Sequence, residues 1–408
     1  MIREQDLLWL EAARNGKVDR AKIMLDRGAD VDSRDRQGNT ALIYAAGRGD
    51  REMVKLAIEA GASVNLHNQP DRLTALMVAV AGNCAEIVKN LIAAGAKVNA
   101  TNDGGTSALT IAAYKGYLAI VKLLLAANAD LNLEDFDGDT AINLAAVSGH
   151  TEVVATLLRA GANPYIGLGA INLAVSENQI ATIDYLLDRL NVNWMNDRGE
   201  TALMTAVTLA NTEICKKLIA AGADPNLRNA KGETALTLAA EQGQLDVFET
   251  IIDSGANVNN KTFSGETPLA IATVEGHLEL VRCSIANQAD INGKDEAGNT
   301  ALHLAVEEGL REIVAELLKN KEIAVDLANN LGNTPLIVAC LQGENAIAQL
   351  LLSKGAKPNL GNNSCQKPLT IAVARQDLEL VKILLAAGAD SNTTDLNSID
   401  NAGATTLT

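Results

Sequence analysis

GNTALIYAAGRGDREMVKLAIEAGASVN, residues 38–65, is the first clear copy of a pattern that recurs along almost the whole chain. Further copies are GETALTLAAEQGQLDVFETIIDSGANVN at 232–259 and GNTALHLAVEEGLREIVAELL at 298–318. The residue that opens each copy is Thr40, Thr74, Ser107, Thr140, Gly169, Thr201, Thr234, Thr267, Thr300, Thr334 or Lys367. Successive positions are 32–34 residues apart, except for the 29 residues from Thr140 to Gly169. A period of this size predicts an array of stacked repeats.

Each copy predicts a pair of helices. Thr or Ser stands at nine of the eleven opening positions, where its hydroxyl accepts a bond from a free N–H of the first helical turn. The short, Ala-rich first helix ends near a glycine, and a second helix of period 3.6 ends at another glycine. Leu190, Gln288 and Lys321 replace that second glycine and predict looser turns. An Asn or Asp then precedes a turn such as DRQG, which predicts a tight hairpin finger between repeats.

These motifs resemble the ankyrin repeat over about residues 5–392, most clearly in GNTALHLA (298–305), SGHTEVV (148–154) and AAGADPN (220–226). The resemblance implies an all-α solenoid of helix-turn-helix units with projecting β-hairpin or turn fingers and a curved superhelix. We expect ankyrin repeats at 36–166 and 197–392, separated by an irregular repeat with a shortened finger at 167–196.

The two ends of the array differ from its middle. Residues 1–35 predict an N-terminal capping repeat that lacks a hairpin, with Trp9 covering the open end. Residues 393–408 restart the motif, with Thr405 as a candidate N-cap, and predict an incomplete repeat or a tail. We therefore expect either a truncated piece of a longer protein or a chain whose missing cap comes from a partner or a second copy.

Composition narrows the classes of partner. The chain holds 34 Lys and Arg against 50 Asp and Glu, a formal net charge of −16, which disfavours nucleic acid and anionic membranes. No signal peptide and no apolar stretch of roughly 20 residues is evident, so we expect a cytoplasmic protein. The five cysteines form no CxxC pair, which predicts neither a disulfide framework nor a zinc site. Core positions are expected for Cys215, Cys283 and Cys340, and an exposed finger position for Cys365.

No constellation of residues predicts catalysis, a cofactor or a metal. HExxH, G-x-S-x-G and GxxxxGK[ST] are absent. The resemblance implies structural hydrogen bonds for His150, His277 and His303, whereas His67 has no obvious partner. The glycines of NPYIGLGAINLA (163–174) suggest a phosphate loop at first, but Asn172 replaces the third glycine and Gly169 aligns with the N-cap Thr140. We therefore predict a non-enzymatic chain.

The resemblance also implies a partner-binding surface. Binding would use the concave face, through the residues that flank each finger glycine and the two residues before each inter-helix glycine. These positions are Arg36, Gln37, Asn39, Arg48, Tyr114, Lys115, Phe136, Asp137, Asp139, Met195, Arg198, Glu200, Lys231, Glu233, Glu241, Phe263, Glu266, Glu275, Glu296, Glu307, Glu308, Leu331 and Asn333.

Charge and aromatic side chains vary along these positions. Arg34, Arg36 and Arg48 make the first fingers basic, whereas glutamates make the later stretch acidic. The glutamates are either solvated charges or a trough for a basic partner segment. Aromatic side chains gather near Tyr114, Phe136, Tyr165 and Trp194, beside Met195, and either contact a partner or fill an irregular junction.

The sequence therefore predicts a protein-binding scaffold or adaptor. The alternatives are the targeting or regulatory arm of a larger enzyme or effector, and an acidic mimic of nucleic acid. Self-association through an uncapped C-terminal end is a further option. The shortened finger at 165–169 is a hinge, a change of curvature or a notch for a partner's side chain, and the sequence does not rank these three.

Overall fold

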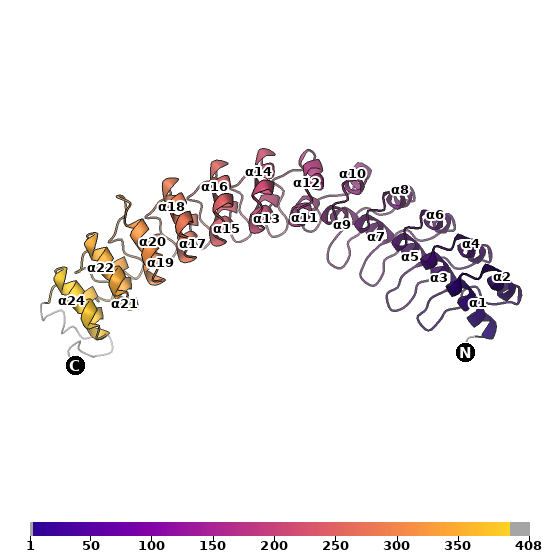
Figure 1. The fold of residues 1–408 in the computed structure, drawn as a ribbon, viewed down its shortest axis with the longest axis horizontal. Helices are drawn as coiled ribbons and strands as arrows, with labels where there is room; N and C mark the ends of the chain where they lie inside the picture. The colour runs from indigo at the N-terminus through magenta and orange to yellow at the C-terminus, as the bar shows by residue number, and fades with distance from the viewer. Residues whose placement is uncertain (1–2, 392–408) are drawn as a thin grey trace. The chain divides into compact units, whose positions relative to one another are not determined.

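The computed structural model describes residues 3–391, in which 24 helices follow one another in pairs (Figure 1). The chain forms two compact units, Met1–Asp197 and Arg198–Thr408. The first unit contains α1 (Glu4–Asn15), α2 (Val18–Asp26), α3 (Ala41–Arg48), α4 (Arg51–Glu59), α5 (Ala75–Ala81), α6 (Ala85–Ala93), α7 (Ala108–Tyr114), α8 (Leu118–Ala126), α9 (Ala141–Val147), α10 (Thr151–Ala160), α11 (Ala170–Ser176) and α12 (Ile180–Leu187).

The second unit continues the same alternation of first and second helices. It contains α13 (Ala202–Thr208), α14 (Thr212–Ala220), α15 (Ala235–Glu241), α16 (Leu245–Asp253), α17 (Pro268–Val274), α18 (Leu278–Ala286), α19 (Ala301–Glu307), α20 (Arg311–Leu317), α21 (Pro335–Gln342), α22 (Asn345–Ser353), α23 (Pro368–Ala374) and α24 (Leu378–Ala386).

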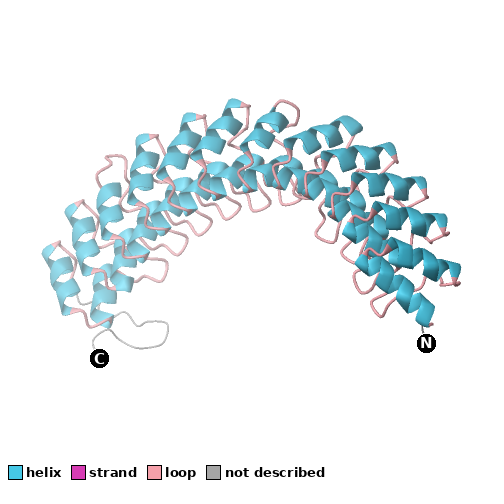
Figure 2. Cartoon of the chain, turned by 45° about the vertical axis from the view of Figure 1, so that its right-hand side comes forward, coloured by secondary structure: helices cyan, strands magenta, loops and turns pink. Residues whose placement is uncertain are grey.

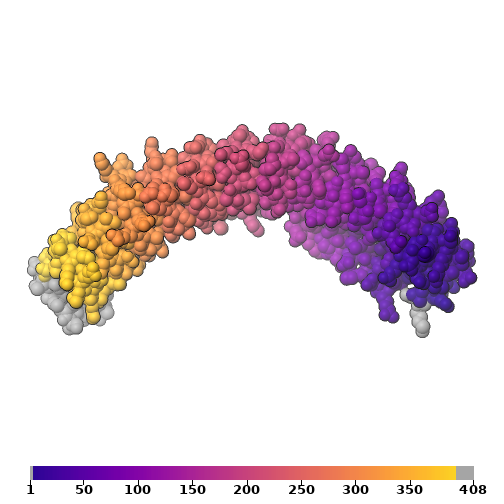
Figure 3. All heavy atoms as spheres, in the orientation of Figure 1, coloured from indigo at the N-terminus to yellow at the C-terminus, as the bar shows by residue number. Residues whose placement is uncertain are grey.

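Within each unit the helices form two layers. Each odd-numbered helix packs on its even-numbered partner and on the next odd-numbered helix, and the even-numbered helices form a second row. The longer loops project from the odd-numbered layer (Figure 2). Side chains close the gaps between neighbouring pairs in the space-filling view (Figure 3). This arrangement confirms the predicted all-α repeat solenoid.

Small and branched aliphatic side chains build the core. Ala45 and Ala46 of α3 are fully buried, as are Val54 and Ala57 of α4, so each pair of helices packs closely on the next. Phe248 is one of the few large aromatic side chains in the interior. The scarcity of aromatic residues therefore fits the close packing of thin, stacked helices.

Side-chain caps start most of the first helices as predicted, although the Thr140 side chain forms no cap. The hydroxyl of the N-cap residue accepts a bond from the N3 backbone N–H at Thr40, Thr74, Ser107, Thr201, Thr234, Thr267 and Thr334. Proline occupies the first helical position of α17, α21 and α23, where its missing N–H costs nothing. The capping pattern therefore sets the period of the fold.

The structure corrects two expectations. Residues 1–35 were expected to form a capping repeat that lacks a hairpin, but α1 and α2 form a packed helical hairpin there. Trp9 lies inside this pair, fully buried, with Nε1 donating to the carbonyl of Val31 at 3.2 Å. Gln288 was expected to mark a looser turn, yet it adopts the left-handed conformation with φ +64°. The repeat geometry thus imposes this conformation on a residue other than glycine.

Between residues 3 and 391 the fingers contain isolated antiparallel bridges, His67 to Thr74 and Thr101 to Ser107, and no named strand. The fingers of this part of the chain are therefore mostly turns.

No helix between residues 3 and 391 is long and apolar enough to cross a bilayer. The expected incomplete repeat at 393–408, with Thr405, lies outside the described residues.

Candidate partner-binding surface

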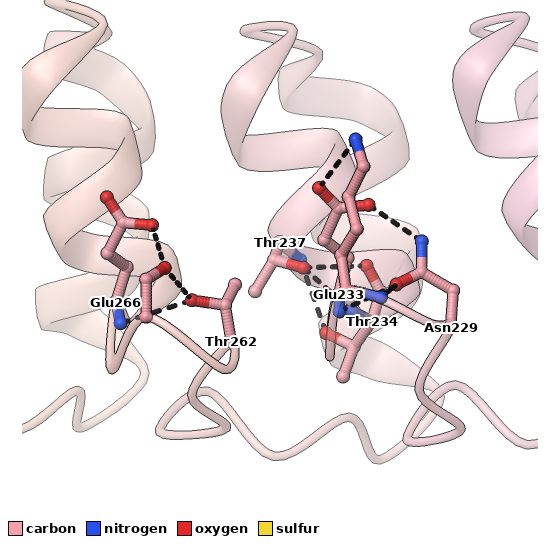
Figure 4. Close-up of polar contacts among 8 residues, drawn as sticks. Asn229, Glu233, Thr234, Thr237, Thr262 and Glu266 are labelled. Carbon is pink, nitrogen blue, oxygen red and sulfur yellow. Dashed lines mark hydrogen bonds and ion pairs between the residues drawn. The ribbon is translucent and has the colours of Figure 1, made fainter.

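Each finger is a turn closed by one polar side chain. In the finger of residues 229–233, Oδ1 of Asn229 accepts from the backbone N–H groups of Lys231 at 2.9 Å and Glu233 at 3.0 Å (Figure 4). The Gly232 N–H donates to the Asn229 carbonyl at 2.9 Å. In the finger of residues 262–266 the hydroxyl of Thr262 takes the same place and accepts from the Glu266 N–H at 3.2 Å. The recurrent Asn, Asp or Thr is therefore a closing residue of the turn.

Backbone hydrogen bonds join neighbouring fingers within each unit. In the first unit the Gln69 N–H donates to the Gln37 carbonyl at 2.7 Å, and the Phe136 N–H donates to the Gly104 carbonyl at 3.0 Å. In the second unit the bonds from neighbouring finger to finger are Ala230 to Arg198, Phe263 to Lys231, Asn330 to Ala297 and Asn363 to Leu331. This ladder fixes the fingers that it joins before any partner arrives, which lowers the entropic cost of binding.

We call the exposed fingers together with the C-terminal ends of the odd-numbered helices the finger face of each unit. Most residues predicted to bind a partner are exposed there. These are Arg36, Gln37, Arg48, Tyr114, Lys115, Phe136, Asp137, Met195, Arg198, Lys231, Glu241, Phe263, Glu275, Glu296, Glu307, Glu308 and Leu331. Their partner-binding role stays a prediction.

Some of the predicted residues serve the finger itself. Asn39 is only 9% exposed, and Asn333 is also buried, so the expectation that their side chains face a partner is wrong. Glu233 accepts from Nδ2 of Asn229 at 2.7 Å, and Glu266 accepts from the Ser264 hydroxyl at 2.6 Å. Asp139 and Glu200 are also half-buried. Internal hydrogen bonds hold Glu233 and Glu266 in place, so neither side chain is fully available.

Large apolar side chains stand at the tips of several fingers. Phe136 is 82% exposed, Phe263 61% and Leu331 67%. Val274 of α17 and Leu341 of α21 are also exposed on the finger face, and sequence reasoning missed both. Each lies two residues before the inter-helix glycine of its own repeat. The rule that selected Glu275 would therefore have selected both of them. The finger face is therefore more apolar than predicted.

Cations end α3 and α7 of the first unit, whereas carboxylates end three consecutive first helices of the second unit. Glu177, which caps α11, and Arg375, which caps α23, are exceptions to this contrast. Arg48 ends α3 and Lys115 caps α7, and a cation is favourable beside the negative end of a helix dipole. In the second unit, carboxylates take the same places, at Glu241 (α15), Glu275 (α17), Glu307 and Glu308 (both α19). Each of these four is exposed, and within the described residues none forms an ion pair. These carboxylates therefore add to the negative potential of the helix ends.

The shortened finger at 165–169 is filled by aromatic packing. The Ala170 N–H donates to the Pro164 carbonyl at 2.8 Å, which closes the short loop. The half-buried ring of Trp194 lies over Gly169, and its centroid is 5.4 Å from that of Tyr165. The Tyr165 hydroxyl accepts from the Asn191 N–H at 3.0 Å. Tyr165 and Trp194 therefore fill the irregular junction, whereas Tyr114 and Phe136 stay exposed.

The histidines make structural contacts. Nε2 of His150 lies 3.0 Å from the Tyr114 carbonyl, and Nε2 of His277 lies 3.4 Å from the Glu241 carbonyl, so both join neighbouring repeats as expected. His303 is buried between Thr300 and the Asn333 carbonyl, and burial lowers the pKa of its imidazole. His67, expected to lack a partner, contacts the Asn68 carbonyl at 3.0 Å.

The cysteines also follow their predicted burial, with one exception. Cys215 and Cys340 are buried, and desolvation raises the pKa of each thiol to about 12. Cys283 is only partly buried, contrary to its expected core position. Cys365 is exposed at the place of a finger glycine, with φ +59°. The two buried thiols are thus packing residues.

Across residues 3–391, no group of three or more His, Cys, Asp or Glu side chains is placed to hold a metal ion. One shallow cavity of about 430 Å³ lies between α8, α10 and α12 in the even-numbered layer, and Lys122, Arg159 and Tyr185 contribute to its lining. This cavity lies away from the finger face.

Comparison with known proteins identifies the family. The family model described as ankyrin repeats (3 copies) matches residues 9–102, 76–167, 171–262, 258–329 and 321–395. These matches cover most of the chain, which therefore belongs to the ankyrin-repeat family. No curated protein matches the chain. Ankyrin repeats generally mediate protein–protein interactions and are typically not catalytic.

Proposed function

We propose that this protein is a non-catalytic scaffold or adaptor that binds a partner protein through its finger face. The observation that carries the proposal is the exposure of Phe136, Phe263 and Leu331 on fingers that backbone hydrogen bonds already hold in place. Exposed aromatic and large aliphatic side chains on a rigid surface are typical of interaction centres. The cytoplasmic location expected from the sequence belongs to the same proposal.

Family membership supports a role in protein binding, and the structure supports the choice of surface. The layer of even-numbered helices also exposes apolar residues, such as Ile23 and Leu378. These lie on single helices, however, whereas the fingertips extend from loops joined in a ladder. Because the fingers are fixed in advance, binding there orders only the partner.

Affinity capture with mass spectrometry tests this proposal. The bait proteins are the full chain, a fingertip variant with Phe136→Ser, Phe263→Ser and Leu331→Ser, and a control variant with Ile23→Ser, Leu378→Ser and Leu385→Ser on the even-numbered layer. All six replaced side chains are exposed, so we expect both variants to melt close to the unmodified protein. The fingertip variant should lose the partners that the control retains. Equal recovery by the fingertip variant and the unmodified protein would overturn the proposal.

A further inference from the structure

We propose that the finger face of the second unit binds a basic partner segment in the polyproline II conformation, with two apolar residues six positions apart and a Lys or Arg midway between them. This inference rests on the proposed function and specifies the chemistry of the partner. It follows from the apolar tips, the carboxylates between them and the spacing of the repeats.

The two apolar residues of the segment would meet Phe263 and Leu331. These side chains stand on fingers two repeats apart, at 262–266 and 329–333. A Cβ added at Gly232 would lie 2.8 Å from Cδ1 of Phe263, so this ring rests directly on the preceding finger. The Leu331 N–H donates to Oδ1 of Asn329 at 3.0 Å. Both tips therefore present exposed side chains on a fixed backbone.

The finger between these two tips carries a charge instead of an apolar side chain. Glu296 is exposed there, and its N–H and Cγ pack against Gly265 of the preceding finger. Glu275 caps α17 on one side, while Glu307 and Glu308 end α19 on the other. The centre of this stretch is thus lined with carboxylates, which favours a cationic group of the partner.

In the part of the chain that the structure describes, the lysines of these fingers form no ion pair with the carboxylates. Nζ of Lys261 donates to the Lys294 carbonyl at 2.7 Å, and Nζ of Lys294 donates to the Ala328 carbonyl at 2.6 Å. Both ammonium groups thus cross to the next repeat along the ladder. Within the described residues, Glu275 and Glu296 form no ion pair. A partner's Lys or Arg would form the ion pair that these lysines do not form.

The spacing of the repeats selects the conformation of the segment. Packed helices lie 8–10 Å apart, so consecutive fingers should follow at about that interval. A polyproline II helix has three residues per turn and a rise of 3.1 Å, which places every third side chain on one face about 9.3 Å apart. A β-strand turns residues three apart to opposite faces. Polyproline II therefore aligns positions 1, 4 and 7 of a segment with Phe263, Glu296 and Leu331.

Synthetic peptides test this register by fluorescence anisotropy with the full chain. The first peptide has the core Leu-Pro-Pro-Arg-Pro-Pro-Leu, the second lacks one proline after the arginine, and the third has Glu in place of Arg. We expect binding of the first peptide that weakens at least about tenfold, which is about 1.4 kcal/mol, in each of the other two. The second peptide loses one apolar contact, and the third places a like charge beside the carboxylates. Added salt should weaken binding of the first peptide.

Protein variants complete the test. Phe263→Ala with Leu331→Ala should lower affinity for the first peptide at least about tenfold, and Glu296→Gln should reduce its dependence on salt. Phe136→Ala, at the matching exposed position in the first unit, is the control and should change nothing. Equal affinity for the first two peptides, or no binding of the first, overturns this inference. If captured partners are still lost from the fingertip variant, the proposed function survives that failure; if they are retained, the proposed function fails as well.

Discussion

The two units build their rows of fingers from the same turn and differ in what those rows carry. In Met1–Asp197 the row includes the shortened finger at 165–169, and Arg48 and Lys115 lie at the ends of first helices. In Arg198–Thr408 the described fingers are of regular length, and glutamates occupy the ends of α15, α17 and α19. The backbone hydrogen bonds between fingers and the side-chain caps of the first helices recur in both units because stacking of the repeats depends on them. The exposed charges vary because packing does not constrain them, which leaves them available for recognition.

The largest expected effect concerns the shortened finger. Gly169→Ala places a Cβ 2.3 Å from Cζ3 of Trp194, at a position where φ is +78°. Overpacking of a filled junction and an alanine held at positive φ together should lower the free energy of unfolding by about 3 kcal/mol. Urea denaturation measures this change.

The matched control for that substitution lies on the preceding finger. Gly138→Ala has φ +81° but meets no atom within 4 Å, so it carries the backbone strain alone. We expect a loss of about 1 kcal/mol. If both variants lose the same stability, Trp194 does not fill the space left by the missing residues.

A regular repeat and the repeat before the shortened finger should respond oppositely to loss of a cap hydroxyl. Thr234 accepts from the Thr237 N–H at 3.3 Å, and Thr237 in turn accepts from the Thr234 N–H at 2.7 Å. Thr234→Val should therefore cost about 1 kcal/mol in chemical denaturation. Thr140 is fully buried and its hydroxyl has no partner, so Thr140→Val should be neutral or slightly stabilising. A similar loss in both variants would show that Thr140 also caps its helix.

A smaller effect is expected at the finger of residues 135–139. Burial, and then the carboxylate of Asp135, raise the pKa of Asp139 above its ordinary value of 3.8. The folded state therefore binds this proton more tightly than the unfolded state, so charged Asp139 opposes folding at neutral pH. Asn39 and Asn299 occupy the equivalent positions, and each points Nδ2 at the carboxylate of its own finger at 3.4 Å.

Asp139→Asn should consequently stabilise the protein by about 0.5 kcal/mol at neutral pH. The difference from the unmodified protein should shrink as the pH falls toward the ordinary pKa of the carboxyl group, because protonation then removes the unfavourable charge. Thermal unfolding across pH measures both effects. A gain that is independent of pH would contradict the electrostatic explanation.

The smallest expected effect compares two helix caps. Lys115 caps α7 and Glu275 caps α17, so their charges have opposite signs relative to the helix dipole. Glu275→Gln should stabilise by about 0.3 kcal/mol and Lys115→Gln should destabilise by about the same amount, with both changes reduced by added salt. Changes of the same sign would show that the helix ends do not set the charge balance of the finger face.

The sequence predicted the repeating parts of the molecule well. Thr234 and its equivalents specify helix starts by a local hydrogen bond, so their spacing alone predicts the helical pairs. Local patterns do not reveal contacts between repeats. Asn333 is buried because Nε2 of His303 contacts its carbonyl and Nδ2 of Asn362 donates to its side chain. Trp194 likewise packs on a loop that precedes it by about one repeat. Such contacts follow only from the stacked structure.

A partner bound at the finger face should protect the backbone amides of the fingers from exchange with solvent. Hydrogen–deuterium exchange on the full chain, free and with a captured partner, measures this protection. We predict slower exchange in the fingers of residues 229–233, 262–266, 295–299 and 329–333, with little change in the even-numbered helices α16, α18 and α20. Protection confined to those even-numbered helices, with unchanged fingers, would contradict binding at the finger face.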